Sequence, residues 1–324
     1  MYFLLVPIFI TTYKIQNLKL LLNILVYSTI LSALMTIILH YFNFDLHLEF
    51  QLSKISPFIN HMYYGSILAF IMLHILININ FNEKLYLFII KIFSIFIILL
   101  AMSYICNRTS IIALILAISI YSWKQFRKKL FNKLKCLFLI IVGSILFMIL
   151  LSNLNKKCFN EFNTLRKSIT QELQNKKPGA SLDCRLNYIK HSTKLIKEYP
   201  ILGVGTGDSL YASKLLIGEN KYKVLVTKPC NLGKHNQIFY FDNHNMYLTM
   251  LMLFGPLGLI IFFYLFYTIY LIGKKYNSLE LILATIMVLI ISIPITIFYT
   301  SVNFILFFSI YIPLIYLNNK YKLI

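Results

Sequence analysis

A histidine and an asparagine stand side by side where a long apolar run of the chain begins. His244 and Asn245 lie in the stretch YFDNHNMYLTMLMLFGPLG, which starts at Tyr240. A histidine titrates near neutral pH and can take a proton from a hydroxyl, so His244 is a candidate general base. Asn245 is a candidate for orienting that histidine or a bound donor, and Asp242 is a weaker candidate for the same work. The alternative is a structural histidine at the edge of an apolar region.

Two arginines are candidates for binding an anion. Arg108, in CNRTSIIAL, stands between two apolar runs, and an arginine at membrane depth is costly unless it faces a polar cavity or a bundle interior. Arg185 stands in the first turn of a predicted helix that Pro200 ends. The alternatives are that Arg108 reaches lipid headgroups and that Arg185 is only solvated. His74 is interpreted as a packed or interfacial histidine, and Lys91 as a snorkelling lysine.

The glycines that follow this helix are candidate donors of backbone N–H groups. The segment reads PGASLDCRLNYIKHSTKLIKEYPILGVGTGDSL, with an expected apolar stripe through Leu182, Leu186, Ile189, Thr193 and Ile196. Successive N–H groups of a turn through Gly203 and Gly205 can bind an anion, so we expect substrate binding there. The alternative is an ordinary glycine turn, since no βαβ context supports a nucleotide fingerprint.

The elements that must position these residues are apolar runs. The chain has 324 residues, 59% of them hydrophobic, and a mean hydropathy of +0.73. Many runs reach about 20 residues, the length that spans a bilayer as a helix. We therefore predict an all-α polytopic membrane protein, a bundle of about nine or more transmembrane helices with one large, partly helical loop. The predicted spans are Met1–Tyr13 (partial), Leu18–Leu39, Phe58–Ile79, Leu85–Ile105, Ser110–Trp123, Cys136–Leu154, His244–Ile272, Leu279–Tyr299 and Phe304–Leu317. The predicted domains are N-terminal transmembrane helices (1–153), the loop (154–243) and C-terminal transmembrane helices (244–324).

Basic residues in the short loops set the predicted orientation. KQFRKKLFNKLK (Lys124–Lys135) is the densest basic loop, and NEK, GKK and NNKYK fall on the same side when the spans alternate. The positive-inside rule makes that side cytoplasmic and the Asn155–Asn243 loop periplasmic. This loop carries 15 Lys and Arg against 7 Asp and Glu, either as a solvated surface or to attract an anionic ligand. Its three cysteines, Cys158, Cys184 and Cys230, leave the choice of a disulfide open.

The apolar run after His244 predicts a bent helix that is packed tightly near its middle. Gly255 follows His244 by eleven residues, almost three helical turns, and is expected on the same face. A glycine there lets another helix approach closely. Pro256 lacks a backbone N–H group and is expected to bend the helix nearby.

Three of these segments occur in a fixed order around the large loop. They are NRTSIIAL, then RLNYIKHSTKLIKEYPILGVGTG, then HN followed by nine residues and GPLG. Between about Met102 and Tyr270 the set resembles the O-antigen ligase and O-antigen polymerase superfamily. It matches that family's Ser-Arg-small segment, its arginine–aromatic helix ending in Pro-x-x-Gly-x-Gly, and its H-[NSQ]-x9-G signature. Asn107 replaces the usual serine, Tyr188 stands where tryptophan is common, and the spans are fewer than is typical of the family.

The resemblance implies an inverting, metal-independent membrane glycosyltransferase that needs no cofactor. Such an enzyme moves a glycan from undecaprenyl pyrophosphate to an acceptor hydroxyl, on the lipid A–core of lipopolysaccharide for a ligase or on another repeat unit for a polymerase. The resemblance implies that Arg108 and Arg185 stabilise the departing diphosphate and that His244 acts on the acceptor hydroxyl. The site would lie at the periplasmic face of the bacterial inner membrane.

We favour the ligase over three alternatives. The first two are an O-antigen polymerase and an O-linked protein oligosaccharyltransferase, which share these motifs. The third is a polytopic transporter, which would usually show repeat symmetry and interrupted helices near mid-membrane. The expected partners are the lipid-linked glycan, the lipid A–core acceptor and the bilayer, and nucleic acid is not expected.

Overall fold

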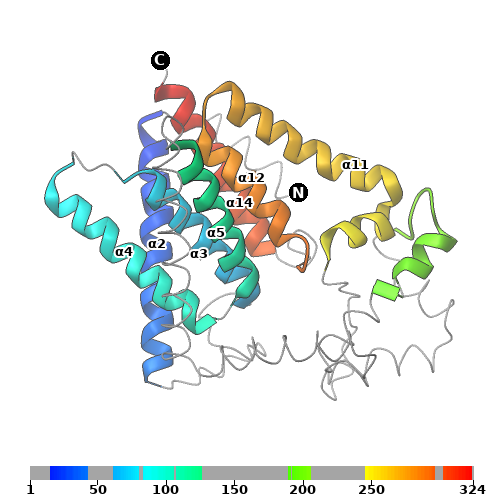
Figure 1. The fold of residues 1–324 in the computed structure, drawn as a ribbon, viewed down its shortest axis with the longest axis horizontal. Coiled ribbons are helices and arrows are strands. Elements are labelled where there is room, and N and C mark those ends of the chain that lie inside the picture. Colours follow the sequence, from blue (N-terminus) through cyan, green and yellow to red (C-terminus); the bar gives the residue numbers. More distant parts are fainter. Residues whose placement is uncertain are drawn as a thin grey trace. The chain divides into compact units, whose positions relative to one another are not determined.

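The described part of the chain is helical. The computed structural model describes residues 15–42, 61–79, 83–105, 107–125, 189–190, 192–205, 245–295 and 302–322, and these ranges contain no β-strand. Figure 1 shows the helices that they form: α2 (Ile15–Tyr41), α3 (His61–Ile77), α4 (Leu85–Ile105), α5 (Arg108–Gln125), α11 (Met246–Lys275), α12 (Leu279–Ile291) and α14 (Val302–Lys322). A chain this apolar satisfies its backbone hydrogen bonds within helices, as lipid requires.

Each of these helices coincides with a predicted span, and α4 matches its span at both ends. By length and composition, three helices can cross a membrane: Leu20–Tyr41, Leu85–Ile105 and Met246–Lys275. Shorter apolar helices cover Tyr63–Ile77, Leu279–Ile291 and Phe304–Asn319. The protein is therefore a multi-pass helical membrane protein. The predicted spans Met1–Tyr13 and Cys136–Leu154 lie outside the described residues, as do all five cysteines.

One predicted span is longer than the helix that forms. The expected span Leu279–Tyr299 contains α12, which ends at Ile291 and is followed by a turn over residues 292–294. Pro294 explains the difference. A proline disfavours helical backbone in the residue before it, so helices usually end at or before that position.

The chain divides into two compact units. The first unit holds α2, α3, α4, α5, α12, α14 and the end of α11 from Thr268 onward. The second unit holds the described residues between 189 and 205, α11 up to Tyr267, and residues 292–295. Arg108 belongs to the first unit, and Gly203, Gly205 and Asn245 belong to the second.

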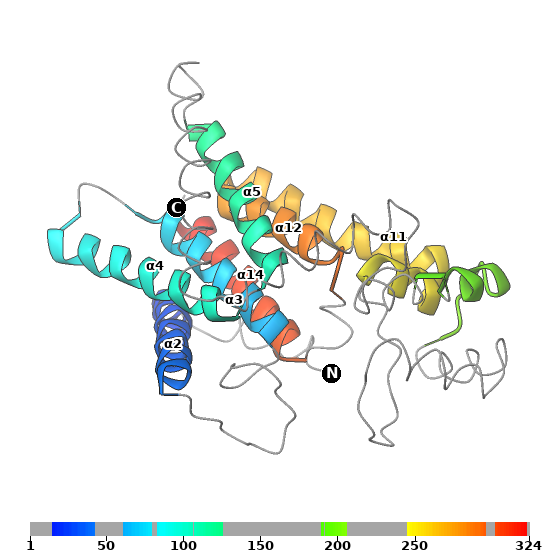
Figure 2. The same ribbon diagram turned by 60° about the horizontal axis from the view of Figure 1, so that its bottom comes forward.

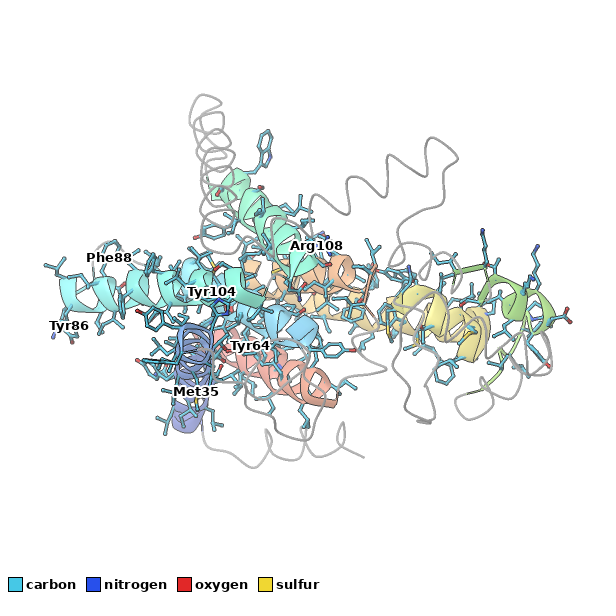
Figure 3. The ribbon with its side chains drawn as sticks, turned by 90° about the horizontal axis from the view of Figure 1, so that it is seen from below. Met35, Tyr64, Tyr86, Phe88, Tyr104 and Arg108 are labelled. Carbon is cyan, nitrogen blue, oxygen red and sulfur yellow. The ribbon has the colours of Figure 1, made fainter. Side chains whose placement is uncertain are left out.

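Helix α3 lies at the centre of the first unit, in contact with α2, α4, α5, α12 and α14 (Figure 2). Phe70 on α3 is fully buried, and its ring centroid lies between 5.8 and 6.2 Å from those of four α14 side chains: Phe304, Phe307, Phe308 and Tyr311. Such ring pairs contribute ~0.5–1.5 kcal/mol each beyond the area that they bury. Tyr64 links α3 to α2, since its hydroxyl exchanges a hydrogen bond with Ser32 Oγ at 2.8 Å (Figure 3).

Contacts between helix ends show which ends share a side within the first unit. His40 and Tyr104, in the last turns of α2 and α4, have ring centroids 4.0 Å apart. Ser66 and Ser110, near the starts of α3 and α5, exchange a hydrogen bond of 2.9 Å. At the opposite ends, Asn319 Nδ2 of α14 donates to Ser278 Oγ before α12 at 2.9 Å. This grouping is the one that the predicted alternation of spans requires.

The surface of the helices is apolar where lipid would cover it. Large exposed apolar side chains include Leu85, Tyr86, Ile89, Phe93 and Phe96 on α4 and Leu257, Ile260, Ile261 and Tyr264 on α11 (Figure 3 labels Tyr86). In water, contiguous patches of this kind would promote aggregation. Lys91 is a charged residue among the apolar side chains of α4. Its Nζ donates to both carboxylate oxygens of Glu83 (2.7 and 2.9 Å) and to the Asn78 carbonyl (2.8 Å). The lysine thus reaches toward the N-terminal end of its helix, as expected for snorkelling.

Candidate active site

The structure describes four of the seven candidate site residues. Arg108 lies in the first unit, and Asn245, Gly203 and Gly205 lie in the second. The remaining candidates lie outside the described residues: Arg185, Asp242 and His244.

Arg108 is the first residue of α5, and its position is fixed by the residue before it. Asn107 Oδ1 accepts a hydrogen bond from the Ser110 backbone N–H at 3.3 Å and so caps the helix. Serine and asparagine both cap helix starts well, so asparagine is compatible with the serine that the resemblance predicts here. Arg108 is partly exposed, whereas Asn107 is buried. Figure 3 labels Arg108 at this end of α5.

Gly65 on α3 lets this helix start pack closely. A Cβ atom at Gly65 would lie 2.6 Å from Asn107 Cβ and 2.8 Å from its Nδ2, far inside normal contact distance. Only glycine therefore fits against the cap without a shift of Asn107. This contact and the Ser66–Ser110 hydrogen bond pack the first turn of α5, which carries Arg108, against α3.

Asn245 is the N-cap of α11. Its Oδ1 accepts a hydrogen bond from the Leu248 N–H at 2.9 Å, and its carbonyl accepts from the Thr249 hydroxyl at 2.8 Å. The Met246 N–H donates to the Ser292 carbonyl at 2.9 Å, which ties the helix start to the turn after α12. The Oδ1 atom of the Asn245 amide is therefore used for capping.

Helix α11 breaks at Gly255. This residue has φ 64° and ψ −166°, outside the helical region, between the segment Met246–Phe254 and the remainder from Pro256. Figure 1 shows the sharp bend between the yellow start of α11 and its long continuation. In an unbroken helix the Met252 carbonyl would accept from residue 256, but proline has no N–H group. The break thus frees the carbonyls of Met252 and Leu253.

A backbone turn supplies the missing donors. The Val204 N–H donates to the Met252 carbonyl and the Gly205 N–H to the Leu253 carbonyl, each at 2.9 Å. The two glycines at this contact allow the backbones to meet. A Cβ at Gly203 would lie 2.6 Å from the Met252 carbonyl oxygen, and a Cβ at Gly255 would collide with the Ile201 carbonyl. Gly203, Gly205 and Gly255 all have positive φ, which disfavours other residues.

These contacts confirm one expectation for α11 and change another. The bend at Pro256 is confirmed. The predicted register of Gly255 beneath His244 stays a prediction, because His244 lies outside the described residues. The described backbone that approaches Gly255 is the Ile201–Gly203 turn and not a helix.

The N–H groups of Gly203, Val204 and Gly205 are each bonded to a carbonyl group. Gly203 donates to Tyr199 at 3.2 Å, and Val204 and Gly205 donate to α11. Presentation of these groups to an anion is therefore not observed, and the alternative of a packing turn describes the geometry. The preceding helical stretch, 192–198, ends before Pro200 as expected, but its buried residues are Ser192 and Leu195, whereas Ile189 is 39% exposed. The expected stripe was wrong over the described residues, because Ile189 and Thr193 are exposed while Leu195 is buried.

A comparison with protein families identifies the chain. The family model described as O-antigen ligase matches residues 92–263, which is more than half of the 324 residues. The chain belongs to the O-antigen ligase family. No curated protein matches the sequence.

The O-antigen ligase match begins within α4 and ends within α11, so it includes all seven candidate site residues. It confirms the resemblance drawn from the three motifs. Membership supports a membrane glycosyltransferase of the O-antigen ligase or polymerase type, acting on a lipid-linked glycan. The backbone partners of α11, Val204 and Ser292, were not among the candidates. The one sequence feature that pointed to these backbone partners was Pro256. A proline has no N–H group for the Met252 carbonyl, so that carbonyl needs a donor from another segment.

Proposed function

We propose that this O-antigen ligase family member transfers a glycan from undecaprenyl pyrophosphate to the lipid A–core of lipopolysaccharide. The observation that carries the proposal is the family match over residues 92–263, which contains both arginines and the histidine of the three motifs. The cap geometry adds support, because it places Asn245 at the first turn of a membrane helix, directly after His244.

In the proposed reaction, an acceptor hydroxyl of lipid A–core attacks the anomeric carbon of the glycan. The bond between that carbon and the pyrophosphate oxygen breaks, and attack from the opposite side inverts the anomeric centre. His244 takes the hydroxyl proton as general base. Asn245 Nδ2 and Asp242 orient the histidine or the donor sugar, and no metal is required.

When the bond to the anomeric carbon breaks, its electron pair stays on the diphosphate, which gains a negative charge beyond those that it carried in the donor. We assign Arg108 and Arg185 to its oxygens, because a guanidinium pairs bidentately with phosphate and keeps its charge at any physiological pH. The start of α5 adds a favourable helix dipole beside Arg108. For Gly203 and Gly205 we propose a positioning role near the substrate, since their N–H groups are already bonded.

A deletion strain separates the ligase from the polymerase. Loss of all polymer from lipid A–core, with lipid-linked polymer accumulating, supports the ligase. Lipid A–core capped by a single repeat unit supports the polymerase instead. Normal lipopolysaccharide in the deletion strain, with an unmodified envelope glycoprotein, would point to the protein oligosaccharyltransferase.

The proposed site faces the periplasm from the bacterial inner membrane. Reporter fusions and labelling of single introduced cysteines test this orientation. Lys124–Lys135 should report as cytoplasmic and Asn155–Asn243 as periplasmic. The reverse result would remove both the orientation and the proposed mechanism, because the lipid-linked donor of a ligase is used on the outer face.

A further inference from the structure

The first segment of α11, Met246–Phe254, is held at both of its ends. At its start, the Met246 N–H donates to the Ser292 carbonyl, and at its end the Met252 and Leu253 carbonyls accept from the turn at 2.9 Å each. The side of the segment that carries these contacts is buried, since Met246 and Thr249 are 0% exposed and Met252 and Leu253 are 1% exposed. Its direction is therefore set from outside the helix, by backbone groups that cannot change rotamer.

This arrangement is not the one that stability alone would favour. An unbroken helix would satisfy the Met252 and Leu253 carbonyls with its own N–H groups and would need neither Pro256 nor a positive φ at Gly255. The break instead makes two carbonyls in an apolar environment depend on another segment, and an unpaired backbone group in such a place costs ~1–3 kcal/mol. In return, the first segment of α11 takes a bent direction relative to the part of the helix that follows Gly255.

We infer that the turn Tyr199–Gly205 is a positioning element that aims the first segment of α11. Through that segment it fixes Asn245, the residue that directly follows His244 in the sequence. The catalytic consequence rests on the proposed function, whereas the backbone joint itself does not. The turn and the break at Gly255 together form one backbone joint between the two segments. Gly203 and Gly255 each leave room for the other segment's backbone.

The test uses a substitution that removes one N–H group. Val204→Pro deletes the donor to Met252, and Val204→Ala is the matched control, because it shortens the side chain and keeps the N–H. Purified full-length variants are compared for melting temperature and for transfer from lipid-linked glycan to lipid A–core. We expect Val204→Pro to lower the melting temperature and to lower kcat about 10²-fold, as misplacement of a reacting group commonly does. The KM for the donor should stay within the range of the control.

A second substitution separates positioning from simple stability. Pro256→Ala restores an N–H that can serve the Met252 carbonyl from within the helix. In the Val204→Pro background it should raise the melting temperature toward the parent value and leave kcat low, because the helix then straightens. Recovery of kcat together with the melting temperature would overturn the positioning role, as would a parental kcat in Val204→Pro.

If Val204→Pro does not accumulate in cells, the Pro256→Ala variant alone tests the inference. Pro256→Ala alone should then lower kcat at least about tenfold with no loss of melting temperature, and a parental kcat would overturn the inference. The melting temperatures need no transfer assay. If the parent itself transfers no glycan to lipid A–core, the proposed function fails, and the coupling between positions 204 and 256 in melting temperature still tests the joint.

Discussion

Replacement of Glu280 by leucine removes an acceptor that serves two other helices. Glu280, in the first turn of α12, is 6% exposed, and His74 on α3 is 9% exposed. The Oε1 atom of Glu280 accepts from His74 Nδ1 at 2.6 Å and from the Tyr311 hydroxyl of α14 at 2.8 Å. The Tyr311 hydroxyl has one further contact, the Phe70 carbonyl at 3.3 Å. One substitution therefore removes the acceptor of His74 Nδ1 and leaves the Tyr311 hydroxyl with only the longer contact to the Phe70 carbonyl.

The magnitude follows from burial and from the membrane reference state. Leaving a buried polar group without its partner typically costs ~1–3 kcal/mol. Polar contacts between membrane helices average only ~0.6 kcal/mol and reach ~1.7, because the unfolded chain in a membrane also finds partners. For Glu280→Leu, which removes two contacts, we expect about 3 kcal/mol in total, near the upper end of these ranges. His74→Leu added to it should cost little more, since the imidazole has already lost its partner, which gives a coupling of about 1.5 kcal/mol.

The assay is unfolding of the purified protein by sodium dodecyl sulfate in bicelles, for the parent, both single variants and the double variant. Glu83→Leu is the control, because its pair with Lys91 has side chains 15% and 29% exposed. A pair that is partly open should contribute less than about 1 kcal/mol. Additive effects of His74→Leu and Glu280→Leu, with no coupling, would refute the account of the buried pair.

Three further predictions concern the site. His244→Ala should abolish transfer while the protein remains folded and inserted, and transfer at the parent rate by the purified variant would remove the histidine from the mechanism. Arg185→Lys should lose about 10²–10³ in rate although the charge is kept, because lysine cannot reproduce the bidentate fork; parental activity would reassign the diphosphate contact. Gly65→Ala should cost ~1–3 kcal/mol by overpacking against Asn107 and should lower transfer through Arg108. An unchanged unfolding midpoint for Gly65→Ala would show that the cap can shift freely.

The helices were predictable where apolar runs end in polar residues. α4 matched its predicted span because Lys84 precedes it and the Asn107–Arg108 pair follows it. α12 did not, because hydropathy continues past Ile291 while Pro294 ends the helix for a steric reason that a hydropathy average does not contain. Hydropathy measures the solvent that a segment prefers, whereas its ends depend on backbone geometry.

Contacts between residues far apart in the sequence were much harder to predict than which residues belong to the motifs. His74 was expected to be packed or interfacial, but its partner Glu280 lies 206 residues away, and no local pattern connects the two. The motif residues Arg108 and Asn245 were identified from the sequence, while the capping roles of Asn107 and Asn245 needed coordinates. Gly203 and Gly205 were assigned to anion binding because a glycine turn exposes N–H groups in general. The structure pairs those groups with carbonyls because a second segment of the chain needed the same donors.

That shared need follows from counting hydrogen bonds within lipid. A glycine followed by a proline in a membrane helix frees carbonyls that water cannot reach, so another segment must supply N–H groups. The donor must approach as a backbone, which requires glycine where the two segments touch and leaves no room for a side chain on either. Gly255–Pro256 and the turn that ends at Gly205 meet both conditions, although about 50 residues separate them. A Gly-Pro break in a predicted span is thus a reason to look for a glycine turn elsewhere in the same chain, because neither sequence satisfies its backbone alone.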